Sequence, residues 1–536
     1  MTAHSARRAA APAPKPEIVI NGLLSLSDFA EIAEGRARVV LAPEIERTIA
    51  VAFGRLARCV EERRLVYGVT TGFGPLANHW VDARHIEELQ RNLIYHLATG
   101  VGARLPYAEA RGLMLARLLS MVQGYSGAAP ELVALMQACL NAGLAPVVPE
   151  KGTVGASGDL TPCAHMALAL MGEGQFFDRD HPARDSRVVL AEVGAAPYRL
   201  DNRDGLALVN GVSAMAAIAA RSQVRSIRAL ETAFRLTSVH AEIFRARAEA
   251  WSSAFGAARP HKGQIAAHAR LNDLIALAPR VDFSRAATRR LGAEDFGADG
   301  VSARPIAHQD PYTLRCAPQI LGACHDMIDV HGGIVATEIN AATDNPIFTE
   351  DEPFALHGGN FYGQHIAFAS DALALAAIKL AILSERQLAR VVDPVLNQGL
   401  PPFLQPNFTG LHSGFMGAQV TASALVAEMR TGAIPASIQS IPTNGNNQDV
   451  VSMGTIAARK TRNLLDDLFR VQAIQALACA QAIDLVARDG AAPGFSPAAL
   501  KFHTRIRASS AFLAADRPLS GEIEALAQSL SAEDWT

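Results

Sequence analysis

The sequence lacks the paired cysteines that bind zinc or form a disulfide framework. Its 536 residues include only six cysteines, and none belongs to a CxxC pair. Isolated thiols in a chain of this length are typical of buried cysteines in a reducing compartment. We therefore expect neither a metal site nor disulfides. The six residues are Cys59, Cys139, Cys163, Cys316, Cys324 and Cys479.

Charge is also scarce. Charged residues make up 19% of the chain, against roughly 25% in an average soluble domain, and the formal net charge is -3. This balance offers no basic stripe for nucleic acid, so we expect a small-molecule partner. Hydrophobic residues make up 49% of the chain. Such a chain buries more surface than a lone monomer needs, which favours an oligomer.

Targeting and membrane-spanning segments are missing as well. The N-terminal residues 1–17 are rich in Ala and Pro but contain no apolar core of a signal peptide, so they predict a disordered tail. The most apolar internal stretch, from Leu373 to Leu383, contains Lys379 and is shorter than the ~20 residues that cross a bilayer. We expect a cytoplasmic protein.

The apolar residues that are present follow a helical period. Between 464 and 485 they recur every three to four residues, and similar patterns cover 108–123, 213–245, 318–341, 371–392 and 412–430. Hairpin signals are few, which predicts a mainly α protein built as a bundle of long helices. We expect a loop-rich N-terminal part at 18–210, and a central helical bundle with C-terminal helices at 211–536.

One glycine-rich loop between these helices has unusual chemistry. In GTVGASGDL, three glycines at 152, 155 and 158 allow a sharply curled backbone around Ala156-Ser157. Taken alone, the segment also fits a turn that caps a helix starting near Asp159. The phosphate-binding GxxxxGK[ST] pattern is absent, and a hydrolase elbow GxSxG would need glycine where Asp159 stands.

In full context, GTVGASGDLTPCAHMALALMGEG resembles the active-site loop of the histidine, phenylalanine and tyrosine ammonia-lyases. The resemblance covers nearly the whole chain and implies that family's fold. It also implies that the Gly158 nitrogen attacks the Ala156 carbonyl carbon, and that loss of two waters, one of them from Ser157, gives a 4-methylidene-imidazol-5-one (MIO). This self-made group would supply an electrophile that no ordinary side chain provides.

The same resemblance assigns roles to other motifs. Tyr67 in YGVTTGFG looks like the base that removes the substrate β-proton; because a phenol has a pKa near 10, a donor such as the Gly74 N–H must favour its phenolate. Asn210 would bind the prosthetic group or the amine. Tyr312 and Arg315, three residues apart, would face the substrate carboxylate. Further positions implied around the substrate are Leu160, Gln309, Asn345 and Phe361.

Two positions bear on the substrate. His96-Leu97 resembles the His-Leu pair of tyrosine ammonia-lyases, where His96 would bond the para-hydroxyl. Gln448 stands where histidine-specific relatives carry Glu, so an imidazole substrate loses a carboxylate partner. Asn447 beside it would support the substrate carboxylate. The sequence therefore predicts deamination of L-tyrosine to p-coumarate and ammonium, with minor activity on L-phenylalanine.

Several alternatives stay open at this stage. Histidine ammonia-lyase and tyrosine 2,3-aminomutase activities would use the same prosthetic group and base. A fumarase-type lyase would also be helical, but its GSSxMPxKxN signature is absent. A non-catalytic scaffold explains the helices without explaining the set of candidate catalytic residues. The resemblance further implies a homotetramer whose helices form a central bundle, and whose active sites draw loops from more than one subunit.

Overall fold

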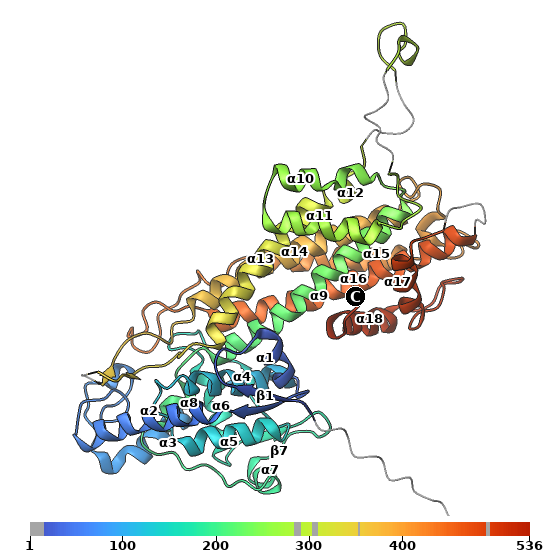
Figure 1. Ribbon diagram of the computed structural model, residues 1–536. Helices are drawn as coiled ribbons and strands as arrows, with labels where there is room; N and C mark the ends of the chain where they lie inside the picture. Colours follow the sequence, from blue (N-terminus) through green and yellow to red (C-terminus); the bar gives the residue numbers. More distant parts are fainter. Residues whose placement is uncertain (1–14, 284–290, 303–308, 352–353, 489–493, 536) are drawn as a thin grey trace, which may run out of the picture. The chain divides into compact units, whose positions relative to one another are not determined.

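The computed structural model describes residues 15–283, 291–302, 309–351, 354–488 and 494–535. These residues are mainly helical, with a few short strands, which confirms the predicted fold class (Figure 1). All six predicted helical stretches lie on helices in the structure. Residues 1–14 of the predicted N-terminal tail lie outside the described residues.

The chain forms two compact units, each built from several segments. The first unit comprises Met1–Arg221, Val335–Ile366 and Gln439–Thr455, and the second comprises Ser222–Ile334, Ala367–Ile438 and Ile456–Thr536. The domain boundaries predicted from the sequence stay a prediction. Four long helices begin or end in one unit and continue in the other: α9 (Ser213–Ile243), α13 (Ala317–Ile339), α14 (Gln364–Val392) and α16 (Gly454–Arg488).

Short helices and small sheets make up the first unit. Strands β1 and β2 pair in parallel, whereas the β3–β5, β4–β6–β7 and β8–β9 sheets are antiparallel. Its elements are β1 (Glu17–Ile20), α1 (Leu26–Ala33), β2 (Arg38–Leu41), α2 (Pro43–Glu61), α3 (Ile86–Leu97), β3 (Val101–Arg104), α4 (Tyr107–Val122), α5 (Pro130–Asn141), β4 (Ala145–Pro146), β5 (Pro149–Lys151), α6 (Leu160–Leu170), β6 (Gln175–Phe177), β7 (Arg184–Asp185), α7 (Ser186–Glu192), α8 (Asp204–Val209), β8 (Ile347–Phe348) and β9 (Ala355–Leu356).

Helix α4 forms the centre of the first unit because it is apolar nearly all round. Every residue from 108 to 122 is buried. The guanidinium of Arg111 donates to the backbone oxygens of Ile32 and Ala33 at the end of α1, and to Leu140 near the end of α5. Carbonyls at helix C-termini lack partners within their own helix. A buried arginine therefore joins the ends of two neighbouring helices to α4.

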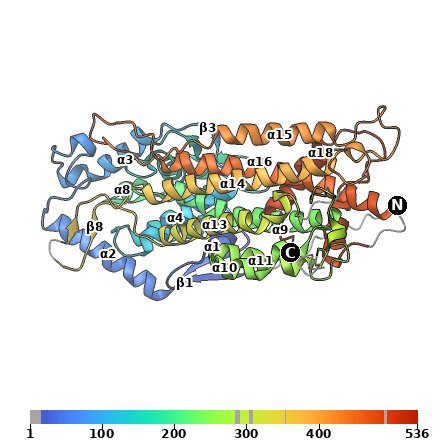
Figure 2. The same cartoon turned by 90° about the horizontal axis from the view of Figure 1, so that it is seen from above.

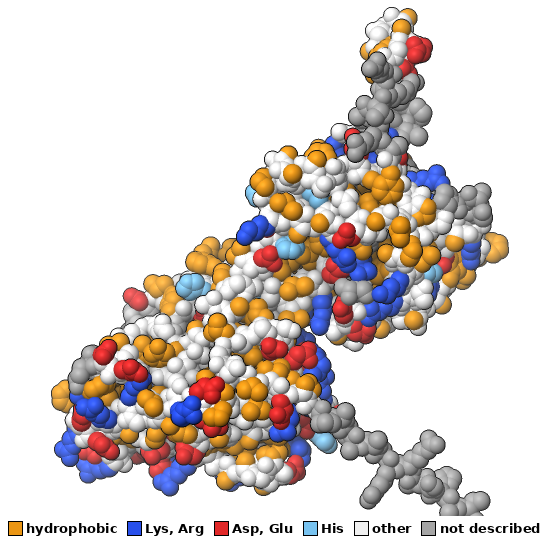
Figure 3. Space-filling model, viewed as in Figure 1, with side chains coloured by type: hydrophobic (Ala, Val, Ile, Leu, Met, Phe, Trp, Pro, Cys, Tyr) orange, Lys and Arg blue, Asp and Glu red, His pale blue; other side chains and the backbone are white. Residues whose placement is uncertain are grey.

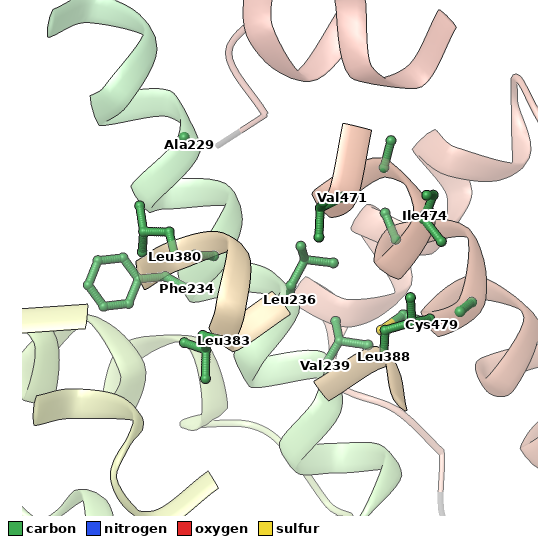
Figure 4. Close-up of a cluster of buried hydrophobic side chains, with 14 of the residues drawn as sticks. Ala229, Phe234, Leu236, Val239, Leu380, Leu383, Leu388, Val471, Ile474 and Cys479 are labelled. Carbon is green, nitrogen blue, oxygen red and sulfur yellow. The ribbon is translucent and has the colours of Figure 1, made fainter. Parts of the chain in front are cut away.

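The second unit consists mainly of helices. Its long helices run side by side in both views (Figures 1 and 2). Aliphatic side chains from three of them meet in one core (Figure 4). Figure 4 labels Phe234, Leu236 and Val239 of α9, Leu380, Leu383 and Leu388 of α14, and Val471, Ile474 and Cys479 of α16. The remaining helices of this unit are α10 (Ser253–Ala258), α11 (Lys262–Ile275), α12 (Tyr312–Arg315), α15 (Met416–Thr431), α17 (Pro497–Arg507) and α18 (Ser520–Ala532).

Helix α14 is the single described helix that is long and apolar enough to cross a membrane by length and composition. Its most apolar window has a mean hydropathy of 2.0, and 72% of that window is buried inside the structure. Burial of this extent is typical of a core helix. On the molecular face in Figure 3, Lys and Arg side chains are interspersed with Asp and Glu, and hydrophobic side chains are exposed between them.

Candidate active site

The loop that carries Ala156-Ser157-Gly158 is held in a curled conformation that requires glycine. Gly155 and Gly158 have φ angles of 69° and 75°. A Cβ on Gly158 would lie 2.1 Å from the backbone oxygen of Gly211, which no side chain tolerates. That oxygen accepts a hydrogen bond of 2.7 Å from the Asp159 N–H. The backbone at Gly158 is thus pressed against the segment that follows Asn210.

Asp159 anchors the same loop to two long helices. Its buried carboxylate accepts a 2.7 Å hydrogen bond from the Met215 N–H of α9, and another from the Thr455 hydroxyl of α16. Burial raises the pKa of Asp159 to about 6, although both hydrogen bonds oppose this shift. The backbone of Gly211 lies so close to Gly158 that a Cβ would not fit there. A loop curled this tightly fits a ring formed from Ala156-Ser157-Gly158.

Ser157 faces a cavity of about 650 Å³ in the first unit. A cavity of this size holds an amino acid side chain with room for its polar end. Nine of the predicted site residues line it together: Tyr67, Gly74, His96, Leu97, Ser157, Leu160, Asn210, Asn447 and Gln448. Phe73, Pro75, Leu76, Leu89, Asn92, Leu93, Leu206, Asn444 and others complete the wall.

Tyr67 lies at one wall of this cavity. The Gly74 N–H donates to its phenolic oxygen at 2.8 Å, the contact that the sequence analysis expected. This hydrogen bond fixes the position of the phenolic oxygen at the cavity wall. Gly74 has a φ of 52°, and a Cβ there would lie 2.7 Å from the Asn444 amide nitrogen. Glycine therefore lets the donor approach.

Helix α3 supplies a second wall with one polar and one apolar edge. Leu89, Leu93 and Leu97 follow each other at intervals of four residues, while Asn92 and His96 form the polar edge. The Nδ1 atom of His96 lies 3.0 Å from the Asn92 backbone oxygen. A carbonyl only accepts, so Nδ1 carries the proton. In the neutral ring, Nε2 is then left as an acceptor.

Gln448 connects the prosthetic loop with the segment 443–448. Its amide nitrogen donates to the Ser157 hydroxyl at 3.2 Å, and its amide oxygen accepts from the Thr443 hydroxyl at 2.8 Å. Because Thr443 occupies the oxygen, the nitrogen faces Ser157. A Glu here would bring a negative charge to the serine, whereas Gln brings a donor.

Asn210 ends α8, and its side-chain oxygen is buried without a hydrogen-bond partner among the described residues. An orphaned buried acceptor beside a cavity indicates a missing donor, which a substrate ammonium can supply. The Asn210 backbone oxygen accepts from the guanidinium of Arg117 on α4. The backbone here is thus fixed, while the side chain is available.

A charge network that was not predicted from the sequence lies behind Asn210. Asp344 is fully buried between Arg203 and Arg117, at 2.5 Å and 3.5 Å. The pKa of Arg117 is lowered by burial, although Asp344 opposes this shift. Two signals could have revealed the network: Arg117 is a charge inside the apolar stretch 108–123, and Asp344 opens the DNP motif.

The other predicted site residues do not line this cavity. Asn345 lies beside Asp344, where its amide oxygen accepts from the Gly358 N–H at 2.6 Å, and Phe361 is half-buried in the same unit. Gln309, Tyr312 and Arg315 belong to the second unit. There the Arg315 guanidinium lies 4.6 Å from the Tyr312 ring and donates to Gln309. Their functional roles stay predictions.

The comparisons with known proteins agree with this architecture. A family model described as aromatic amino acid lyase matches residues 24–508. The fold and the match together define a carbon–nitrogen lyase. The chain belongs to the aromatic amino acid lyase family, which confirms the resemblance found in the sequence.

Relatives within this family differ in their stated activities. A tyrosine ammonia-lyase from Cereibacter sphaeroides is 49% identical over 96% of this chain and 98% of its own length. A histidine ammonia-lyase from Symbiobacterium thermophilum is 40% identical over 94% of both chains. The crystal structure of a tyrosine aminomutase from Streptomyces globisporus superposes with a TM-score of 0.89, at 36% identity, over 96% of this chain and 97% of that one.

Proposed function

We propose that this protein deaminates L-tyrosine to trans-p-coumarate and ammonium without oxidation. One observation carries the choice of substrate: His96 lies in the same cavity as Tyr67 and Ser157. The Asn92 backbone oxygen binds its Nδ1, which leaves Nε2 as a hydrogen-bond acceptor. The relative with 49% identity is a tyrosine ammonia-lyase, which supports this choice. The electrophile would be the MIO group formed autocatalytically from Ala156-Ser157-Gly158.

Elimination needs one proton acceptor and one site for the amine. Tyr67, as phenolate, takes the proton from the substrate Cβ; the electron pair of that C–H bond becomes the new double bond, and the C–N pair leaves with nitrogen. The buried oxygen of Asn210 accepts from the departing amine. When formed, the MIO group supplies the electrophile that this elimination requires.

His96 selects the ring by hydrogen bonding. Its Nε2 accepts from the para-hydroxyl of tyrosine, which can donate, while Leu93 and Leu97 contact the ring faces. Phenylalanine leaves Nε2 unpaired. Because His96 is exposed, water can partly satisfy that nitrogen, so we expect minor phenylalanine activity rather than none. For a histidine substrate, Gln448 offers a neutral amide in place of the carboxylate that would attract the imidazole ring.

The substrate carboxylate requires a cation that the cavity wall lacks. Among the described residues that line the cavity, none is Lys or Arg. We propose that Arg315 of another copy binds the carboxylate, with Gln309 and the exposed ring of Tyr312 holding its guanidinium in place. This assignment requires assembly, and a homotetramer is the state we propose.

The decisive experiment is to incubate the purified protein separately with L-tyrosine, L-phenylalanine and L-histidine and to record the ultraviolet absorbance of each conjugated acid. We expect p-coumarate to form fastest, and the Ser157→Ala variant to be inactive while its peptide keeps the unmodified mass. Dominant urocanate would overturn tyrosine as the substrate. Formation of β-tyrosine instead of p-coumarate would identify an aminomutase.

A further inference from the structure

The backbone of Tyr67 is held by a histidine from another part of the first unit. His357 follows strand β9, and its Nε2 accepts a hydrogen bond of 3.1 Å from the Tyr67 N–H. The phenolic end of the same residue accepts from the Gly74 N–H at 2.8 Å. Tyr67 is therefore fixed at its backbone and at its side chain, and one of the two contacts depends on a titratable ring.

Other groups near Tyr67 have partners that do not titrate in the neutral range. The Gly68 N–H donates to the Thr71 hydroxyl at 3.0 Å, and the Gly68 oxygen accepts from the Gln90 amide at 2.7 Å. Val66 and Val69 are buried in a cluster with Phe348 of β8 and Ala355 of β9. The base loop thus packs on the hairpin that precedes His357, and the histidine is a polar link between them.

The surroundings of His357 favour its neutral form. Among the described residues, Tyr67 of the base loop contacts its Nε2, and Arg203 from the turn before α8, itself paired with Asp344, acts on it electrostatically. Partial burial lowers the pKa of His357 below its ordinary 6.5, and the positive charge of Arg203 lowers it further. At neutral pH, Nε2 is accordingly available as an acceptor.

We propose that His357 is a positioning residue for Tyr67: its neutral ring holds the base loop through the Tyr67 N–H, and protonation releases this hold. Protonated Nε2 is itself a donor, so it faces the Tyr67 N–H donor to donor. The contact is lost and the loop is free to move from the productive geometry. This inference rests on the proposed function, because it concerns the base of that reaction.

Two variants separate acceptor chemistry from simple packing. His357→Gln keeps an acceptor oxygen that does not titrate, and His357→Leu removes the acceptor. With L-tyrosine, we expect His357→Leu to lower kcat by about tenfold to a hundredfold with little change in KM, because misplacing a catalytic group acts on the chemical step. We expect His357→Gln to restore most of kcat, and its kcat to fall less steeply than that of the wild type below pH 6.5.

A matched control exists elsewhere in the same unit. His165 on α6 accepts the Gly100 N–H through Nε2 at 3.0 Å, and burial lowers its pKa as well. His165→Gln replaces the same kind of contact without touching the base loop, so its acid limb should match that of the wild type. Hydrogen–deuterium exchange of peptides covering 66–74 should be faster in His357→Leu than in either Gln variant, whether or not the enzyme turns over.

The outcomes are distinguishable. A His357→Leu variant with wild-type kcat and wild-type exchange would overturn the positioning role. An acid limb that stays the same in His357→Gln would overturn the role of protonation. If His357→Leu does not fold, the pH profile of His357→Gln still decides. A wild-type protein that forms no p-coumarate would overturn the proposed function itself, whereas exchange in 66–74 would still test the contact.

Discussion

The two units fill their interiors in different ways. In the first unit, Arg111, Arg117, Arg203 and Asp344 are fully buried, and many of their bonds run to backbone oxygens or to one another. In the second unit, the core consists mainly of Leu, Ile, Val, Ala and Phe side chains (Figure 4). Apolar contacts are non-directional, whereas charged hydrogen bonds fix particular atoms. The second unit also has buried hydrogen bonds, such as those from Ser496 to Glu242, but the fully buried arginines named above belong to the unit whose loops form the cavity.

Glycines of the catalytic loop differ from glycines at open helical positions. In the first unit, a Cβ on Gly158 or on Gly211 would lie within 2.2 Å of a neighbouring atom. In the second unit, Gly417 in α15 and Gly333 in α13 have nothing within 4 Å of such a Cβ. Close backbone contacts also occur inside the second unit, where a Cβ on Gly263 of α11 would lie 2.1 Å from the Gly322 oxygen of α13. The contrast is therefore between the catalytic loop and these open helical positions.

Adding one methyl group to Gly158 should abolish activity. In Gly158→Ala, the new Cβ would meet the Gly211 oxygen at 2.1 Å and the residue would keep a φ of 75°, so the loop must move. We expect loss of activity by more than about a hundredfold, and a loop peptide that keeps the two waters lost on ring formation. Kinetics and peptide mass spectrometry measure both. Gly417→Ala is the control in the second unit and should react like the wild type; equal activity in both variants would remove the contrast.

The buried ion network should matter for stability and for the site. Asp344→Asn leaves two buried guanidiniums without their carboxylate, which costs about 3 to 5 kcal/mol. Because Arg117 also holds the Asn210 backbone, kcat should fall as well. Leu468→Ala in the second core should cost about 2 to 5 kcal/mol without lowering kcat of the folded enzyme. Denaturant unfolding and kinetics compare the pair. A loss of kcat in both Asp344→Asn and Leu468→Ala would show that the interiors of both units position the catalytic residues.

Much of the first-unit site was predictable from the sequence because short motifs determine it. Tyr67, Ser157 and Asn210 stand in loops whose glycines and polar residues are adjacent in the chain, and the structure places all three at one cavity. The Gly74 contact also joins residues of one short motif, seven positions apart. The helices were predictable because their apolar residues repeat every three to four positions over long stretches.

What the sequence did not reveal depends on contacts between distant residues. Arg117 and Asp344 are 227 positions apart, and Tyr67 and His357 are 290 apart. No local pattern sets such pairs; only the folded backbone does. Asn345 was predicted to bind substrate, but it does not line the cavity, and its amide oxygen accepts from the Gly358 N–H. A motif therefore marks a segment near the site without saying which side chain faces the cavity.

One buried polar residue of the second unit makes its stability depend on pH. His240 on α9 is fully buried, neither ring nitrogen has a partner among the described residues, and burial lowers its pKa to about 3. Below the ordinary value of 6.5, the unfolded chain binds a proton that the folded chain refuses, so stability is present above that pH and is lost as pH falls. We expect the stability advantage of His240→Leu over the wild type to grow by about 2 kcal/mol between pH 7.5 and pH 5.

Denaturant midpoints at the two pH values measure this change. An advantage that is equal at both pH values would show that His240 is protonated within the fold, or that the unfolded chain does not bind the proton. Activity at pH 7.5 should be unchanged, because His240 is buried beside Phe244 in the second unit and does not line the cavity. Unchanged activity would show that the pH effect of His240 acts on the stability of the second unit. It would be distinct from the proposed effect of His357 on the base loop.

The smallest expected effect separates the loops of the first unit from the unit as a whole. Gly54 is exposed in the middle of α2, and a Cβ there would meet nothing within 4 Å. Gly54→Ala should stabilise the protein by about 0.5 to 1 kcal/mol, because alanine loses less backbone freedom on entering a helix. Thermal unfolding of Gly54→Ala and Gly158→Ala, measured side by side, tests whether only the curled loop is destabilised by an added methyl group. A destabilised Gly54→Ala would instead mean that the first unit resists added volume even in its exposed helices.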